Sequence, residues 1–328
     1  MSIFRRKDEE EIDEEESQER ELSRKKIKDL KPENRKKRKE LSKPWGKKER
    51  YLVLGTVLGT VVISAVLFAS ARSWKLPGLP KFSFPSFNQE AIVITADKKQ
   101  QDSAKATIST FREKTDRLSG IYAFYVIRLG DGFFYGVSEG SRMQAASLIK
   151  LPIMSLVYKK SEEGTIRLDD KIPGSARSYR QLVEAMGQRS DNSAQITLVR
   201  HFGKEEIQNY IGQIGMGKTS LAENETTPSD IGLFFKKLYQ GDLVSEASRD
   251  EILDFLTNTI YEDWLVKGIP EVRVAHKYGR EVHVVNDAGI VFAPKPFVLV
   301  IMTDGVVEKE ADSIFPQLAR LIYEAETR

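Results

Sequence analysis

The sequence predicts an α/β fold of the α+β kind over residues 91–328, with an antiparallel sheet flanked by helices and a helical lobe. Two observations predict this class. Helical patterns fill the middle of the segment, about residues 145–260, and strand patterns lie on both sides of them. The strand patterns are 121–129 and 133–137 before the helices, and 272–279, 282–293 and 296–305 after them. This order fits one sheet that is completed by both ends of the domain.

The individual elements follow from local patterns. Residues 103–118 predict a helix that precedes the first strand. The first two strands are joined by Gly130-Asp131-Gly132, which is typical of a β-hairpin turn. The last three strands follow one another closely, as in an antiparallel meander. A closing helix over 314–325 places apolar side chains on one face, namely Ile314, Leu318, Leu321 and Ile322.

Composition excludes several classes of function. Lys and Arg total 51 against 48 Asp and Glu, and this balance does not indicate a nucleic-acid partner. The absence of cysteine excludes disulfides, thiolate metal sites and cysteine nucleophiles. Three histidines, His201, His276 and His283, leave few groups for a metal site or a Ser-His-Asp triad. We therefore expect no metal and no organic cofactor.

The first 90 residues predict three segments outside the folded domain. Residues 1–50 are charged, have too few apolar side chains for a core, and predict a disordered cytoplasmic tail. Residues 51–71 carry no charge, and a helix of about 20 residues spans a hydrocarbon core roughly 30 Å thick. They predict a transmembrane helix. Residues 72–90 contain Pro77, Pro80 and Pro85 and predict a semi-stiff linker.

Charge on the two sides of the apolar segment predicts its orientation. Lys and Arg are dense before residue 51, whereas only Arg72, Lys75 and Lys81 follow shortly after residue 71. This asymmetry predicts a cytoplasmic N-terminus and an extracytoplasmic domain in a single-pass membrane protein. Ala69-Ser70-Ala71 also has the form of a signal-peptidase site, and cleavage there would release the domain. The apolar run and the tail before it exceed the usual signal-peptide lengths, which favours a retained anchor.

One candidate for catalysis is the tetrad Ser147-Leu148-Ile149-Lys150. A buried helical pattern follows it, and Pro152 is expected near the start of that helix, where proline is tolerated. Ser147 would then lie at a helix N-terminus, which favours negative charge. Lys150 would lie one turn further on the same face, close enough to accept the hydroxyl proton if burial keeps it partly neutral. By itself, S-x-x-K also occurs by chance in many helices.

Two more clusters follow along the chain. Ser190-Asp191-Asn192 precedes a helical pattern, and these residue types are common helix caps, so Asp191 is expected to be structural. Lys277-Tyr278-Gly279 lies on a predicted strand, where an edge lysine is often simply solvated. Each cluster alone therefore has an ordinary structural explanation.

Together and in this order, the three clusters resemble the serine β-lactamase and penicillin-binding protein superfamily, and most nearly the class A β-lactamases. The neighbouring segments AASLIKLPIM, SDNSA, TTPSDIG, HKYGRE and NDAGIV resemble it too. The resemblance covers roughly residues 100–328. It implies a β-lactamase/transpeptidase-like fold with its site in the cleft between sheet and lobe.

The resemblance also implies a covalent mechanism. Ser147 would attack an amide carbonyl and Lys150 would accept its proton, while Ser190 would relay a proton to the leaving nitrogen. Lys277 would supply positive charge for a substrate carboxylate and help to tune Ser190.

Four further positions are implied to bind substrate. Asn192 would hold its side-chain amide, and Tyr278 and Gly279 belong to the substrate-binding strand. The backbone N–H groups of Ser147 and Arg280 would form the oxyanion hole.

The sequence departs from the class A pattern at two functional positions. The E-x-x-x-N segment, whose glutamate activates the deacylating water in that class, is absent here. Glu223 and Glu225 are carboxylates in the same region, but neither has the expected spacing, so deacylation is expected to be slow. Tyr278 stands where the class has a threonine. Because tyrosine is larger, the resemblance does not determine which substrate binds here.

Two other motif matches lack the context that they need. Residues 212–219 match the P-loop pattern, but a helical pattern precedes them instead of a strand. Residues 136–140 match the nucleophile elbow G-x-S-x-G, but no apolar helix follows them. His276 and His283 are expected to pack or to face solvent.

The sequence thus predicts a membrane-anchored serine hydrolase that acts on β-lactams or on D-Ala-D-Ala-like peptide amides of peptidoglycan. The alternative is a non-catalytic cell-wall binding domain that retains the fold. The absent glutamate and Tyr278 favour the alternative, whereas the complete set Ser147, Lys150, Ser190 and Asn192 favours catalysis.

Overall fold

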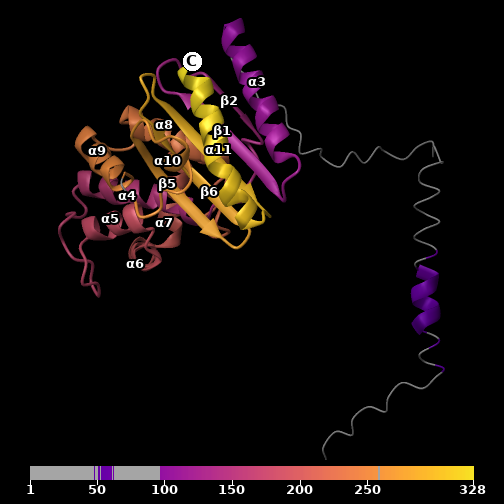
Figure 1. Cartoon of the computed structure of the whole chain (residues 1–328). Helices are drawn as coiled ribbons and strands as arrows, with labels where there is room; N and C mark the ends of the chain where they lie inside the picture. Colours follow the sequence, from indigo (N-terminus) through magenta and orange to yellow (C-terminus); the bar gives the residue numbers. More distant parts are fainter. Residues whose placement is uncertain (1–47, 49–50, 52, 61, 63–96, 258) are drawn as a thin grey trace, which may run out of the picture. The chain divides into compact units, whose positions relative to one another are not determined.

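The computed structural model describes residues 48, 51, 53–60, 62, 97–257 and 259–328 (Figure 1). The chain divides into two compact units, Met1–Phe82 and Ser83–Arg328. In the first unit, the described residues from 51 to 62 are helical. No helix within the described residues has the length and apolar character needed to cross a membrane. The predicted tail and linker and much of the predicted membrane segment lie outside the described residues.

The described residues of the second unit form a five-stranded sheet in the order β2-β1-β7-β6-β5. The strands are β1 (Ile121–Arg128), β2 (Phe134–Val137), β5 (Val274–Glu281), β6 (Val284–Val291) and β7 (Phe297–Asp304). Every neighbouring pair is antiparallel. β1 pairs with β7 along its whole length, from Ile121 opposite Asp304 to Arg128 opposite Phe297. The prediction of one antiparallel sheet completed by both ends of the domain is confirmed.

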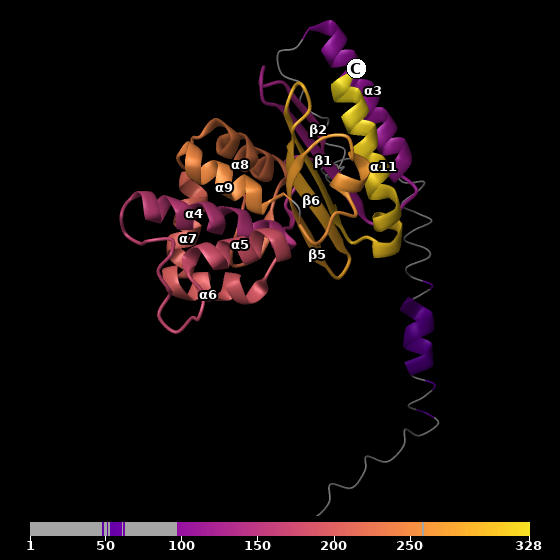
Figure 2. The same cartoon turned by 60° about the vertical axis from the view of Figure 1, so that its left-hand side comes forward.

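Helices cover both faces of this sheet (Figure 2). On one face lie α3 (Lys98–Thr115), α11 (Glu308–Thr327) and the short α10 (Leu265–Gly268). The helical lobe lies on the other face and consists of α4 (Lys150–Glu162), α5 (Tyr179–Arg189), α6 (Asn192–Phe202), α7 (Lys204–Gln213), α8 (Pro228–Gln240) and α9 (Glu246–Phe255). A 3₁₀ turn, η2 (Ala146–Ile149), leads into α4. The short strands β3 (Met143–Gln144) and β4 (Glu225–Thr226) pair with each other beside η2.

Strand side chains alternate between a core on each side of the sheet. In β1, Ala123, Tyr125 and Ile127 pack with the lobe. Tyr122, Phe124 and Val126, which alternate with them, pack under α3 and α11. Because successive side chains of a strand point to opposite faces, a strand buried on both faces has a nearly continuous apolar sequence. The central strands can therefore hold polar groups only where these are paired or serve the site.

Two predicted helix boundaries differ from the structure. The helix predicted over 103–118 begins at Lys98, where Asp97 caps it by accepting a hydrogen bond from the backbone N–H of Gln100. The helix predicted over 314–325 begins at Glu308 and contains Pro316 in its interior. The first turns of both helices are polar, so apolar periodicity could not reveal them.

Candidate active site

Ser147 lies in a turn with an unusual backbone conformation. It is part of η2, which passes directly into α4 at Lys150. Ala146, immediately before it, has φ of +49°, a left-handed conformation that is rare for residues with a side chain. Such conformations cost energy and persist where the surrounding structure enforces them, often at functional sites. Pro152 lies in the first turn of α4, as predicted. Because N–H groups in the first turn have no intrahelical acceptor, the missing N–H of proline costs the helix no hydrogen bond.

The amine of Lys150 is the centre of the site. Within the described residues, Nζ lies 2.7 Å from Ser147 Oγ, 2.7 Å from Asn192 Oδ1, 3.2 Å from Ser190 Oγ and 3.0 Å from the Ser190 carbonyl oxygen. Only 1% of the Lys150 surface is exposed. Burial lowers the pKa of Lys150 to about 8, although the charges of Asp191 and Glu281 oppose the shift. An appreciable fraction of Lys150 is therefore neutral near pH 7, and a neutral amine can accept the proton of Ser147.

The Ser190-Asp191-Asn192 segment joins two helices. Ser190 ends α5 with φ of +54°, another left-handed residue that carries a side chain. Asp191 caps α6 and accepts hydrogen bonds from the backbone N–H groups of Ser193, at 2.7 Å, and Ala194, at 3.1 Å. The predicted structural role of Asp191 is thereby confirmed. The tight reversal directs Ser190 and Asn192 toward the same amine.

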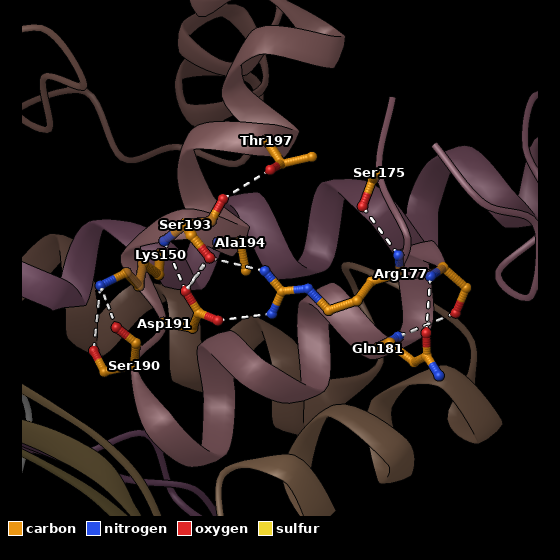
Figure 3. Close-up of polar contacts among 10 residues, drawn as sticks. Lys150, Ser175, Arg177, Gln181, Ser190, Asp191, Ser193, Ala194 and Thr197 are labelled. Carbon is orange, nitrogen blue, oxygen red and sulfur yellow. Dashed lines mark hydrogen bonds and ion pairs between the residues drawn. The ribbon is translucent and has the colours of Figure 1, made fainter. Parts of the chain in front are cut away.

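Arg177 holds this segment through hydrogen bonds to two of its side chains (Figure 3). Its guanidinium donates to Asp191 Oδ2 at 2.7 Å and to Ser193 Oγ at 2.8 Å. Burial raises the pKa of Asp191, but the Arg177 guanidinium and the donors of Ser193 and Ala194 hold that pKa well below its usual range. Asp191 is thus charged at neutral pH and can both cap α6 and oppose the pKa shift of Lys150. No sequence motif pointed to Arg177.

Strand β5 lies directly against the Ser147 turn. A Cβ atom on Gly279 would lie 2.9 Å from the Ser147 backbone nitrogen and 3.0 Å from Ala146 Cβ, so this approach requires glycine. The His276 N–H donates to the Leu256 carbonyl, away from β6. Because N–H directions alternate along a strand, the Arg280 N–H faces the same side as that of His276. The Arg280 N–H therefore points away from β6, next to Gly279, which contacts the Ser147 turn.

The remaining residues of β5 have different environments. Lys277 is fully buried, and its Nζ donates to the Tyr278 carbonyl at 3.0 Å. Burial and the nearby Lys150 charge lower the pKa of Lys277 well below its usual value, while Asp287 opposes them. The Arg280 side chain forms a two-pronged ion pair with Asp312, at 2.8 and 3.0 Å. Thus Lys277, which the sequence assigned to a substrate carboxylate, is enclosed by protein.

These elements border a cleft of about 510 Å³. Its lining combines the polar residues Ser147, Ser190 and Asn192, the aromatic residues Tyr261, Trp264 and Tyr278, and the charged residues Arg189, Asp263, Lys267, Arg280 and Asp312. A cleft with a few polar groups beside aromatic rings is expected for a small-molecule or peptide site. Within the described residues, no group of three or more His, Cys, Asp or Glu side chains could hold a metal ion.

The two carboxylates proposed near the site do not reach this cleft. Glu223 is exposed on a loop, and Glu225 lies in β4 opposite Gln144. Neither lines the cleft in the described part of the chain. Glu281, at the end of β5, is the nearby acid that sequence reasoning missed. It accepts hydrogen bonds from Gln144 Nε2 and Asn224 Nδ2, both at 3.0 Å, and opposes the pKa shift of Lys150.

The other motif matches have structural explanations. Residues 212–219 begin in the last turn of α7 and continue as a loop, so no strand precedes them as a P-loop requires. Residues 136–140 leave β2 in a turn and are not followed by a helix. His276 is fully buried, and its Nδ1 lies 2.7 Å from Asp287 Oδ1. The His283 side chain is exposed.

Comparison with known proteins agrees with the resemblance seen in the sequence. A family model described as the "Beta-lactamase enzyme family" matches residues 103–325. Among solved structures, PBP-A is 24% identical over 69% of this chain and 95% of its own, with a TM-score of 0.61. A class A β-lactamase of the last common ancestor of Gram-negative bacteria is 23% identical over 67% and 99%, with a TM-score of 0.64. These structures share the fold with this chain. No curated protein sequence matches it.

Replacing Asp191 should destabilise the domain more than replacing an ordinary helix cap. Asp191→Ala removes the cap of α6 and the partner of Arg177, whereas Asp97→Ala removes only the cap of α3. A lost cap costs about 1 kcal/mol of unfolding free energy. We expect that loss for Asp97→Ala and about 1 kcal/mol more for Asp191→Ala, because Arg177 also loses a charged partner. Urea unfolding of both variants measures this, and equal losses would contradict the role given to Arg177.

Proposed function

Because the chain belongs to the beta-lactamase enzyme family, we propose that it is a serine hydrolase that forms an acyl-enzyme on Ser147. Its substrate would be a β-lactam or a D-Ala-D-Ala-like peptide amide. One observation carries the proposal: the buried Lys150 amine lies 2.7 Å from Ser147 Oγ, and its pKa is lowered to about 8. A serine beside a partly neutral amine is an activated nucleophile.

In the acylation step, Ser147 Oγ attacks the substrate carbonyl carbon while its proton passes to Lys150 Nζ. The carbonyl oxygen becomes an oxyanion between the N–H groups of Ser147 and Arg280; removing one such donor typically costs about 3–4 kcal/mol of transition-state stabilisation. The C–N bond then breaks as the leaving nitrogen receives a proton through Ser190, whose Oγ lies 3.2 Å from Lys150 Nζ. The acyl group remains on Ser147 as an ester.

The deacylation step has less support from the structure. Water must attack the ester, and a carboxylate that removes its proton would accelerate the attack. Neither Glu223 nor Glu225 lines the cleft. The carboxylates that line it within the described residues are Asp263 and Asp312, and Asp312 is engaged by Arg280 and by Trp264 Nε1, the latter at 3.1 Å. We therefore propose slow turnover, with behaviour nearer to a penicillin-binding protein than to an efficient β-lactamase.

We further propose that residues 51–71 anchor the protein in the membrane, with its N-terminus cytoplasmic and the catalytic domain outside. The proposal rests on the uncharged run in the sequence and on the Lys and Arg residues before it. The described residues within the run are helical. This location would bring the active site to cell-wall peptides.

Acyl-enzyme formation can be measured directly. We expect the detergent-solubilised full chain, mixed with a penicillin, to gain one penicillin mass in intact-protein mass spectrometry. Ser147→Ala should gain none, and peptide mapping should place the adduct on Ser147. A long-lived adduct is expected, because neither Glu223 nor Glu225 lines the cleft and Asp312 is engaged by Arg280. Unmodified wild-type protein after prolonged incubation with both a penicillin and a D-Ala-D-Ala peptide would contradict catalysis and favour the non-catalytic binding domain.

The acylation rate should rise with pH. Lys150 accepts a proton only as a neutral amine, so the rate should increase through its pKa of about 8 and level off above it. Well below that pKa, we expect about a tenfold fall per pH unit. The profile is obtained by quenching samples at set times between about pH 6 and about pH 10 and measuring the acylated fraction by mass spectrometry. Lys150→Arg, which stays protonated, should be unreactive throughout; a flat wild-type profile would exclude Lys150 as the base.

Membrane anchoring has its own measurement. After expression in bacteria, the full chain should remain in the membrane pellet through an alkaline carbonate wash. A chain that begins at Ala91 should not. Recovery in the soluble fraction of a shorter product, whose mass shows that it begins at Arg72, would instead show cleavage after Ala69-Ser70-Ala71.

A further inference from the structure

Tyr278 separates the buried amino group of Lys277 from the cleft. The Tyr278 side chain lines the cleft, whereas Lys277 is 0% exposed and is not among the described residues that line it. Lys277 Nζ lies 3.9 Å from the centre of the Tyr278 ring and donates to the Tyr278 carbonyl at 3.0 Å. The ring therefore covers the Lys277 amino group, and a substrate in the cleft meets the tyrosine first.

The Tyr278 ring is held firmly in this position. The Tyr261 ring packs against it with centres 4.3 Å apart, and the Trp264 ring lies 6.3 Å away. Trp264 is itself fixed by the hydrogen bond from its Nε1 to Asp312 at 3.1 Å. Moving the ring aside would break this aromatic packing, so the cover over Lys277 is a fixed part of the wall.

The Tyr278 hydroxyl is a buried polar group without a well-formed hydrogen bond. Only 5% of the residue is exposed, and its hydroxyl meets no partner in good hydrogen-bond geometry within the described residues. Burial raises the pKa of Tyr278 well above its usual value, although a hydrogen-bonding interaction with the nearby Ser190 side chain opposes this. The group therefore stays an O–H donor at neutral pH. A buried donor without a well-placed acceptor is costly, and an acceptor on a bound substrate would reduce that cost.

From this geometry we infer that the site selects a neutral carbonyl, and not a free carboxylate, beside the scissile bond on the leaving-group side. The inference rests on the proposed function, because Ser190 defines that side by protonating the leaving nitrogen. The natural substrate would then be a peptide amide within a longer chain, whose next residue continues as an amide. A C-terminal D-Ala carboxylate would be a poorer fit.

Desolvation explains this preference. A carboxylate entering the site loses much more hydration energy than an amide or ester carbonyl does. Lys277 cannot offset that loss directly, because the Tyr278 ring covers it, and the charge of Arg280 is already compensated by Asp312. Tyr278 offers one neutral O–H donor, which satisfies a neutral carbonyl well. Arg189 and Lys267 also line the cleft and are exposed, so they keep much of their hydration and cost a carboxylate less desolvation than they would if buried, but also attract it less.

The test compares a penicillin with its methyl ester, which differ only in the charge of that group. Acylation of the full chain by each is followed by intact-protein mass spectrometry. We expect wild-type protein to react at least about threefold faster with the methyl ester, because only the free acid must lose the hydration of a carboxylate on entering the site. Equal rates, or any preference for the free acid, would overturn the inference.

Two variants distinguish the effect of the Tyr278 ring on the acid-to-ester ratio from the effect of its hydroxyl. Tyr278→Thr uncovers Lys277 and should react with the acid at least about tenfold faster than with the ester. Tyr278→Phe keeps the cover and should show no acid preference, although both reactions should slow as the donor is lost. An unchanged acid-to-ester ratio in Tyr278→Thr would also overturn the inference. Failure of both probes to acylate wild type would instead contradict the proposed function itself.

Discussion

The desolvation of the Lys150 amine is the constraint on which the rest of the site depends. A buried ammonium is costly unless oxygen atoms surround it, and here the acceptors come from Ser147, Ser190 and Asn192. The same burial lowers the pKa of Lys150 to about 8, which makes the group useful as a base. Stability and chemistry thus require the same arrangement. Ser147 must stand at the start of α4, and the segment between α5 and α6 must turn back toward it.

Several supports far apart in the sequence maintain that arrangement. Arg177, from the loop before α5, holds Asp191 and Ser193 and so fixes the start of α6. Gly279 lets β5 approach the Ser147 turn, and the left-handed conformations of Ala146 and Ser190 give the turns their direction. β5 is positioned by its pairing with β6, within a sheet that β1 completes from the other end of the domain. The site therefore depends on the whole sheet being formed.

Two substitutions relative to the class A pattern act on different steps of one reaction. In the proposed mechanism the missing glutamate would slow deacylation, because no acid near β4 lines the cleft within the described residues. Tyr278 would act on substrate choice, because its ring lies against Lys277 and its side chain lines the cleft. Neither change touches the contact between Ser147 and Lys150. Deacylation and substrate choice could thus vary independently on this scaffold, since different elements carry them.

The sequence alone determined the fold class, the antiparallel sheet and the membership of Ser147, Lys150, Ser190 and Asn192 in one cluster. Strand and helix periods, together with short motifs in a set order, carry that information locally. It missed the starts of α3 and α11, whose first turns are polar. Only the tertiary structure decided that Arg177 and Glu281 act on the site, that Glu223 and Glu225 do not line the cleft, and that Tyr278 covers Lys277. The physical reason is that the burial of a side chain, its pKa and the residues that cover it depend on neighbours from distant parts of the chain. No local sequence pattern records these neighbours.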